Sequence, residues 1–394
     1  MKNIKLIIID FLKSKNLFNL IYSKIIFVKR FILKKKKINF KNNFILVGDK
    51  NSDNFLGYYD INNISSDRQK ILFHRKNKLS DYVNICVYEC NKRGVKIFDS
   101  SSAWSWQLGS RLRWLSNKEL IFNCIDDNKN LISRSLNIEN KLSKNFSYPF
   151  FSITKDNRFA ATLNFKRLEY CRPGYGYLFS QEKFKDDENF LYIWDLKTNN
   201  IVNIYNENYF DINLKNFFKE YYFNHISWSP NNFNFILYAI DKFSRSNKLI
   251  FFKNFKTYEL IKDIEIISHH EWINDYEILF FGEIGKVKSF FRYNLKSKQF
   301  TKLNFDFSDK DGHPNTSNGN LFVIDTYPNQ FQERFLYTFD LKLNEFKILG
   351  SAFNNFYLTK EKKCDFHPKI SNDNKIILID TSHNLKREFI ILER

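Results

Sequence analysis

The chain has 394 residues, of which 43% are hydrophobic and 18% aromatic, a composition that supports a large folded core and excludes an intrinsically disordered protein. Its net charge of +19 is unevenly spread, because residues 1–41 hold twelve basic side chains and a single acid, Asp10. No helix-turn-helix, zinc-finger or RNA-binding signature accompanies this charge, so we predict no nucleic-acid partner.

Residues 1–41 form the first predicted unit, a basic amphipathic helical segment. Large apolar side chains recur there at helical spacings. The stripe consists of Ile4, Ile8, Phe11, Phe18, Tyr22, Ile25 and Ile32. Four consecutive lysines, Lys34–Lys37, follow the stripe and favour an anchor on an anionic membrane surface. A helix packed against the outer wall of the main domain, or a frayed tail, would show the same pattern.

Residues 42–394 contain a weak internal repeat and form the second predicted unit. Each copy has a polar turn followed by a short apolar strand, and Asp, Asn, Gly and Ser supply the conformations of a tight hairpin turn. The turns begin at Ile64, Trp114, Ile153, Trp228, Trp272, Thr316 and Ile370. Seven copies, each with four strands and about 40–50 residues, predict an all-β fold, a seven-bladed β-propeller. A β-sandwich or a pair of β domains is the alternative.

Two segments depart from the simple repeat. The opening strand, Asn43–Val47, is predicted to complete the last blade by joining Glu388–Leu392, which closes the ring. The third copy is overlong by about one blade's worth of residues. Its insertion, Arg167–Asp187, is predicted to be a loop across one mouth of the propeller.

Four of the seven histidines occupy one repeat position, three residues before the residue that opens the turn. They are His225, His269, His313 and His367, and the first three are 44 residues apart. Equivalent positions of consecutive blades lie around one ring, and this position begins the innermost strand. We therefore expect four imidazoles to converge on the central channel.

Imidazoles around a cavity can bind a divalent metal, or act as general acid and base near neutral pH. Carboxylates near them are candidate orienting partners. These are Asp311, Asp325, Asp365 and Asp380. The alternative is that blade duplication copied one structural histidine four times. His383 lies outside the register but close after Asp380, and is a second-rank candidate for substrate binding.

The five cysteines form no Cys-x-x-Cys pair and are odd in number, which favours reduced thiols over a disulfide framework. No signal peptide is evident, because the apolar stretch Leu6–Leu12 is broken by Asp10 and no small-residue cleavage site follows. No run reaches the roughly 18 apolar residues of a spanning helix. We expect a cytoplasmic protein, peripheral at the inner membrane face if its first helix binds lipid.

Three short stretches carry a resemblance to a known family. They are Gly57–Asp60, Asp311–Pro314 with Asp325–Pro328, and Cys364–Pro368. They resemble bacterial WD40-like, TolB-type propeller proteins, which occur with surface-polysaccharide genes and are similar to the oligogalacturonate-lyase propellers. The resemblance covers roughly residues 45–394, and the aligned histidines are its more specific part.

The resemblance implies a function. Oligogalacturonate lyases are seven-bladed propellers that bind a divalent metal, typically manganese, through histidines and a glutamine. They cleave uronate-containing oligosaccharides by β-elimination. By this resemblance, His225, His269, His313 and His367 are the expected metal ligands and an acidic glycan is the expected partner. No residue here matches the family's glutamine.

A mechanism that fits these residues has the metal bind the substrate carboxylate while the α-proton is removed. A ring residue away from the metal, or Tyr58, Tyr59 or Arg172, is the candidate base. Flat aromatic surfaces for sugar rings are expected from Trp106, Tyr175 and Tyr177. Inter-blade packing is the alternative role for such a tryptophan.

Two other classes compete with the lyase. The first is a non-catalytic propeller that binds glycan or protein. The second is a glycosyltransferase-like protein of glycan assembly, which the basic N-terminal helix favours. No Gly-rich phosphate loop supports the second class.

Overall fold

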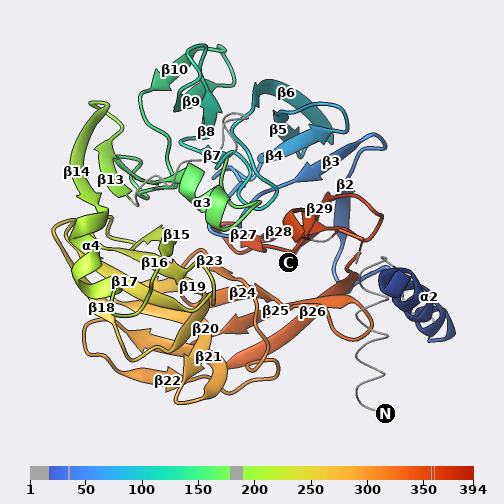
Figure 1. Cartoon of the computed structure of the whole chain (residues 1–394). Helices are drawn as coiled ribbons and strands as arrows, with labels where there is room; N and C mark the ends of the chain where they lie inside the picture. Colours follow the sequence, from blue (N-terminus) through green and yellow to red (C-terminus); the bar gives the residue numbers. More distant parts are fainter. Residues whose placement is uncertain (1–16, 34–35, 178–189, 356, 359) are drawn as a thin grey trace.

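The computed structural model describes residues 17–33, 36–177, 190–355, 357–358 and 360–394. Seven antiparallel sheets surround a central axis, each with its first strand at the centre (Figure 1). The prediction of a seven-bladed propeller is confirmed. All five cysteines are free.

The first four blades follow chain order, and in each the strands run from the channel outward. Blade 1 holds β3 (Ser52–Phe55), β4 (Lys70–Asn77), β5 (Val83–Glu89) and β6 (Gly94–Ser101). Blade 2 holds β7 (Arg113–Trp114), β8 (Glu119–Ile125), β9 (Leu131–Asn137) and β10 (Ser143–Phe146). Blade 3 holds β11 (Ser152–Ile153), β12 (Phe159–Leu163), β13 (Phe190–Asp195) and β14 (Asn200–Asn206). Blade 4 holds β15 (Tyr221–Trp228), β16 (Phe235–Asp241), β17 (Asn247–Lys253) and β18 (Thr257–Ile261).

The last three blades include strands from both ends of the chain. Blade 5 holds β19 (Ile266–Asn274), β20 (Glu277–Ile284), β21 (Val287–Asn294) and β22 (Phe300–Lys302). Blade 6 holds β23 (Pro314–Thr316), β24 (Leu321–Asp325), β25 (Glu333–Asp340), β26 (Glu345–Phe353) and, as a fifth strand, β1 (Ile38–Phe40). Blade 7 holds β27 (Lys369–Ile370), β28 (Ile376–Thr381), β29 (Glu388–Glu393) and β2 (Phe44–Val47).

The ring closes through β2, which pairs antiparallel with β29 so that Phe44 lies opposite Leu392 and Val47 opposite Phe389. This pairing confirms the predicted closure. The neighbouring strand β1 pairs with β26 of blade 6 instead. The two N-terminal strands are therefore the outermost strands of blades 6 and 7.

A hydrogen-bond pattern that recurs in several copies of the turn explains why polar residues repeat there. In the first copy, Ser65 Oγ donates to Asp67 Oδ1 at 2.6 Å, and the backbone N–H of Arg68 donates to the Ser65 carbonyl at 2.8 Å. The same side-chain bond joins Thr154 to Asp156, Ser229 to Asn231 and Ser371 to Asp373. Arg68 adopts φ +60°, which favours Asn or Gly at the equivalent position of other copies. Asn157, Asn232, Gly319 and Asn374 occupy that position with positive φ.

Blade 1 has a broken inner strand, and the break fills the central channel. β3 pairs with β4 up to Phe55, and pairing resumes only at the bridge between Ile64 and Ile71. The intervening residues 56–63, which we call the central segment, leave the sheet at Gly57, where φ is +90°. The central segment carries Tyr58 and Tyr59 to the axis, where both are buried.

Residues of other blades hold the central segment in place. Asp380 of β28 accepts from the backbone N–H of Leu56 at 2.9 Å, and Lys369 Nζ donates to the Gly57 carbonyl at 3.0 Å. The remaining bonds are Asn315 Nδ2 to the Tyr59 carbonyl, Tyr59 Oη to the His270 carbonyl, and a bidentate pair between Arg111 and Asp60. Four other blades therefore contribute to fixing one loop at the axis.

The insertion in blade 3 covers the channel mouth at which the inner strands begin. It opens with α3 (Phe165–Cys171), which Asn164 caps by accepting from the backbone N–H of Arg167. The following turn reaches the axis, because the Tyr175 ring lies 6.2 Å from that of Tyr58. The predicted loop across a mouth is confirmed as far as residue 177, and residues 178–187 of that loop lie outside the described residues. A further helix, α4 (Glu207–Leu214), links blades 3 and 4.

The N-terminal helix α2 (Leu17–Ile32) lies against the outside of the propeller (Figure 1). The predicted helical residues 3–16 lie outside the described residues. The docked face differs from the predicted apolar stripe, because Ile26 and Arg30 are buried while Ile25 and Ile32 of the stripe are 47% and 69% exposed. Among the described residues, no helix is both long enough and apolar enough to cross a membrane.

Candidate functional site

The four histidines of the common register converge at one mouth of the channel. The ring centroids of His225 and His269 are 6.1 Å apart, those of His269 and His313 4.0 Å, and those of His313 and His367 4.6 Å. All four side chains are buried. They form a continuous arc, the histidine arc, contributed by blades 4, 5, 6 and 7.

Tyr58 and Tyr59 of the central segment face this arc. The Tyr58 ring lies 5.3 Å from His225 and 4.7 Å from His367, between the two ends of the arc. The Tyr59 ring lies 5.3 Å from His313. Burial raises the pKa of both phenols well above the usual value, so both stay protonated near neutral pH.

Two carboxylates orient the central histidines of the arc. Asp325 Oδ1 lies 2.9 Å from His313 Nδ1 and also accepts from the His313 backbone N–H at 2.7 Å. This pairing assigns the ring proton to Nδ1 and leaves Nε2 as a lone-pair donor. Asp311 pairs in the same way with His269 Nδ1 at 3.2 Å, although it lies in sequence beside His313. Of the four predicted orienting carboxylates, Asp325 and Asp311 therefore contact histidines of the arc, Asp311 across a blade boundary. Asp380 instead accepts from a backbone N–H of the central segment.

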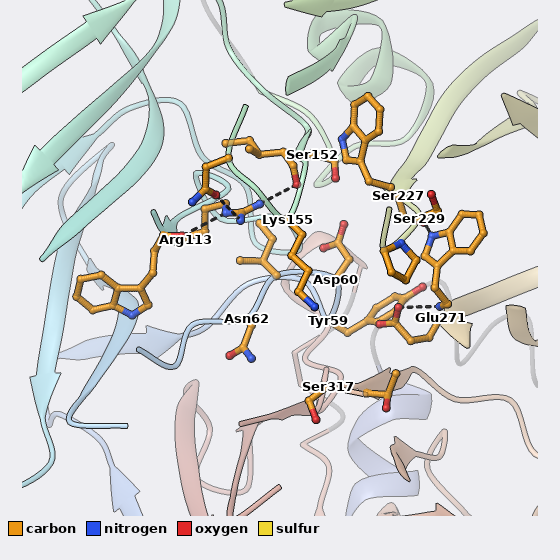
Figure 2. A pocket seen from close by; sticks show the side chains of 18 of the residues that line it. Tyr59, Asp60, Asn62, Arg113, Ser152, Lys155, Ser227, Ser229, Glu271 and Ser317 are labelled. Carbon is orange, nitrogen blue, oxygen red and sulfur yellow. Dashed lines mark hydrogen bonds between the residues drawn. The ribbon is translucent and has the colours of Figure 1, made fainter. Parts of the chain in front are cut away.

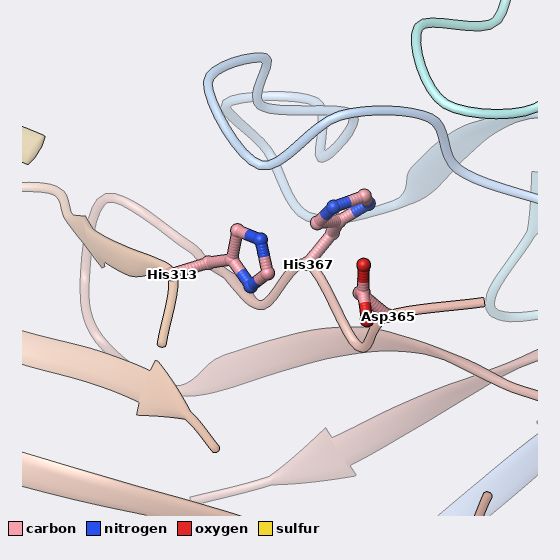
Figure 3. A group of neighbouring side chains, drawn as sticks. All are labelled: His313, Asp365 and His367. Atoms are coloured by element: carbon pink, nitrogen blue, oxygen red, sulfur yellow. The ribbon is translucent and has the colours of Figure 1, made fainter. Parts of the chain in front are cut away.

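One group in the arc has the arrangement of a metal site. His313, Asp365 and His367 each offer one ligand atom, and these atoms lie within 4.8 Å of one another (Figure 3). His367 Nε2 is buried and has no hydrogen-bond partner among the described residues. An unpaired buried nitrogen is costly, and coordination would satisfy it.

Both ends of the arc are held in an uncommon backbone conformation. His225 adopts φ +55° and His367 φ +45°, the left-handed region that L residues seldom occupy. Each such residue costs on the order of 1 kcal/mol or more, and such residues cluster at functional sites. The fold therefore places these two rings at a cost to its own stability.

The protonation states suit cation binding. Burial lowers the pKa of His225, His269 and His367, so these imidazoles are neutral near pH 7. The carboxyl group of Asp365 is anionic, because the charges of Arg334 and Lys363 outweigh burial and hold its pKa well below the usual range. The group His313, Asp365 and His367 thus combines two imidazole nitrogens with one carboxylate oxygen.

Aromatic and basic side chains surround the entrance to the arc. The Arg172 guanidinium lies 3.9 Å from the centroid of the Tyr175 ring, and both side chains are only partly buried. Across the arc, Tyr327 lies 6.1 Å from His313 and is 36% exposed. Lys363 Nζ lies 4.2 Å from the Tyr327 ring centroid. The entrance therefore presents two aromatic rings and two cationic groups.

Three predicted substrate-binding residues are not brought to the arc. Tyr177 is fully buried against Phe165, with ring centroids 4.5 Å apart, so it has no free face for a sugar and serves packing. His383 is buried beside Glu388 at 3.6 Å, in contact with none of the four histidines. Trp106 packs against Phe55, with ring centroids 5.5 Å apart, and its ring centroid lies 5.1 Å from the Arg387 guanidinium.

Two residues of the site lay outside the principal sequence candidates. Asp365 was predicted only as an orienting carboxylate, and its position two residues before His367 was the available signal. Tyr327 stood within a family-like stretch but carried no predicted role. The structure explains both, because the loops before β27 and after β24 meet at the arc.

At the opposite mouth of the channel lies a cavity of about 720 Å³, lined mainly by the repeated turns (Figure 2). Tyr59 and Asp60 of the central segment form part of its wall, and His225 at one end of the histidine arc also lines it. Burial raises the pKa of Glu271, which faces the cavity, to about 8. Trp114, Trp228 and Trp272 of the turns line this cavity and are buried. The indoles of Trp114 and Trp272 donate to neighbouring blades, to the Asn63 carbonyl and to Ser227 Oγ.

Comparisons with known proteins place the fold. No protein-family model and no curated protein matches this chain. An oligogalacturonate lyase in complex with manganese is similar with a TM-score of 0.65 at 13% identity, covering 91% of this chain and 98% of that chain. An oligogalacturonate lyase from Vibrio parahaemolyticus gives 0.62 at 10% identity, with the same coverage. The β-propeller domain of the Trilobed protease from Pyrococcus furiosus gives 0.53 at 10% identity, covering 86% and 95%. At these identities, the likeness establishes that this chain shares the propeller fold of these proteins.

Proposed function

We propose that this propeller binds a divalent cation at the histidine arc and cleaves acidic, uronate-containing oligosaccharides by β-elimination. The observation that carries the proposal is the convergence of His313, Asp365 and His367, with ligand atoms within 4.8 Å of one another. Manganese is the first candidate, because the similar lyase structure is a complex with manganese. Surface-polysaccharide metabolism is the proposed setting.

The residues present fit such a cation. His313 has its Nδ1 engaged by Asp325 and its Nε2 free, His367 has a buried Nε2 without a partner, and Asp365 supplies charge. His269 adjoins His313 and is the candidate fourth ligand. A cation bound there would neutralise a substrate carboxylate and stabilise the charge that develops next to it.

The other residues would bind and orient the sugar. Arg172 and Lys363 offer positive charge to an acidic glycan, and Tyr175 and Tyr327 offer ring faces beside them. His225 lies at the end of the arc away from Asp365 and is neutral, so we propose it as the proton acceptor. Tyr58 lies between His225 and His367 and is better suited, as a neutral phenol, to donate a hydrogen bond.

The metal content of the protein, purified without a histidine tag or chelators, tests the first half of the proposal. We expect about one divalent cation per chain in the wild type and none in the variant H313A/H367A. His383→Ala is the matched control, because this buried histidine lies outside the arc. Protein that stays metal-free after incubation with manganese and zinc would refute the metal site.

Product formation tests the second half. Metal-loaded protein and oligouronates should yield an unsaturated product, followed by its ultraviolet absorbance, and H225A should lower that rate while it retains the metal. A non-catalytic glycan-binding propeller is the second candidate, favoured because Tyr58 occupies the space enclosed by the arc. Glycan binding without any product would establish that candidate instead.

A further inference from the structure

The helix α2 has two different apolar faces, and only one of them contacts the propeller. The inner face holds Ile26, which is 2% exposed, and Arg30, which is 5% exposed. Arg30 donates to the Phe331 carbonyl at 3.0 Å and pairs with Glu333 at 3.5 Å. Phe27 adds a ring contact with Phe353 at 5.8 Å. Ionic and apolar contacts thus fix this helix to blade 6.

The outer face presents large apolar side chains to solvent. Ile25, Val28, Phe31 and Ile32 recur at helical spacings of three and four and are 47%, 56%, 85% and 69% exposed. They lie on the side opposite Ile26. A contiguous exposed face of this kind marks an interaction surface.

The charge around this face is of one sign. Lys24, Lys29, Lys36 and Lys37 are exposed, and the sequence has no acidic residue from position 11 to position 48. Lysines beside an apolar helical face are typical of helices that lie in the interface of an anionic membrane. Two copies of this face would instead bring like charges together, which opposes self-association.

From these observations we infer that the outer face of α2 binds the surface of an anionic lipid membrane, with α2 lying parallel to it. The contacts of Arg30 and Ile26 would then hold the propeller at a fixed orientation to the membrane. Lys24, Lys29 and Arg30 interrupt the apolar residues of the helix, a pattern that suits lying in the interface rather than crossing the bilayer.

Co-sedimentation of the full chain with lipid vesicles tests the inference. We expect binding to phosphatidylcholine vesicles that contain about a third phosphatidylglycerol, weakening as salt rises, and little binding to phosphatidylcholine alone. The variant V28E/F31E should lose about tenfold or more of this binding, because it places negative charge on the outer face, the face that would enter the lipid. Lys24→Gln and Lys29→Gln should each lower binding by about fivefold.

Leu142→Glu is the matched control, because Leu142 is 70% exposed on blade 2, far from α2 in the chain. It should bind as the wild type does. Equal binding to neutral and anionic vesicles, or wild-type binding by V28E/F31E with unchanged thermal unfolding, would overturn the inference. A dimer that V28E/F31E dissociates, together with no vesicle binding, would overturn it and assign the face to a second copy.

Discussion

At the scale of single residues, two carboxylates orient the two central imidazoles of the arc, His269 and His313. Asp325 is the clearest case, because it is fully buried and bonds both the ring and the backbone of His313. Such a carboxylate fixes the ring tautomer and raises the basicity of the free nitrogen. The orientation of these two rings is therefore set by residues that need not touch a cation.

Replacing Asp325 by Asn should weaken cation binding by about 10–100-fold while the fold is retained. The amide keeps the shape of the side chain but loses the negative charge that holds the Nδ1 proton. Titration of metal-free protein with manganese measures the change. Asp340→Asn, a turn carboxylate on the same blade, should bind as the wild type does, and equal affinities for all three proteins would refute the role of Asp325.

Two buried histidines outside the arc predict how stability depends on pH. Burial lowers the pKa of His74 and of His270 to about 3 from the ordinary 6.5. The unfolded chain takes up these protons below about pH 6.5 and the folded chain does not, so stability is lost as pH falls from there toward 3. Each group contributes up to about 1.4 kcal/mol per pH unit.

Urea unfolding at about pH 7.5 and about pH 5.5 measures this loss. His74→Gln removes one of the two titrating groups. The free energy of unfolding should therefore fall less between the two pH values in this variant than in the wild type. Its absolute stability also falls, because His74 accepts from the Ser110 backbone N–H at 3.0 Å, and so the slope is the informative quantity. A variant slope equal to that of the wild type would contradict the prediction.

At the scale of elements, the central segment depends on one buried cation. Lys369 is fully buried, and its Nζ donates to the carbonyls of Gly57 and His367. It therefore ties the segment to His367, the last histidine of the arc. Lys369→Met should lower the free energy of unfolding by about 3 kcal/mol, because it leaves two carbonyls and the buried Asp380 without their cation.

Denaturant unfolding measures that loss, and Lys375→Met provides the control, since Lys375 is exposed in the same blade. The control should change stability by less than about 0.5 kcal/mol. Equal stabilities of both variants would show that the central segment is held by its other contacts.

The elements show where prediction from the sequence succeeds and where it stops. The blades could be predicted because the hydrogen bonds of each turn join residues that are close in the sequence, such as Ser65 and Asp67. The break in the inner strand of blade 1 could not, because its bonds come from residues more than 300 positions away, such as Lys369 and Asp380. The histidine arc is an intermediate case. Its residues are far apart in the sequence, but they share one position of the repeat, and the propeller places that position of every blade around one ring.

At the scale of the whole molecule, the ring is closed by strands from both ends of the chain. Deletion of residues 1–48 removes β1 and β2 and exposes the outer edges of β26 and β29. We expect the midpoint of thermal unfolding to fall by at least about 5 °C. Deletion of residues 1–33 removes only α2 and should cost less than half as much, so equal losses would refute the importance of closure.

The chemistry of the site was less predictable than its location. The four histidines were found from spacing alone, whereas Asp365 joins them because the loop before β27 folds back over the mouth. Tyr177 was misjudged for the same reason, since its burial against Phe165 depends on how α3 packs. Side chains on the inner strands follow the repeat, and side chains on the covering loops do not.

The central segment fills the axis of the propeller beside the histidine arc. Tyr58 and Tyr59 are each 2% exposed, and Tyr59 is hydrogen-bonded to His270 of blade 5 and Asn315 of blade 6. A polymer cannot be threaded through a ring that is filled in this way. A glycan bound at the arc would therefore enter and leave on the same side of the molecule, which would favour short chains and chain ends over the interior of a long strand.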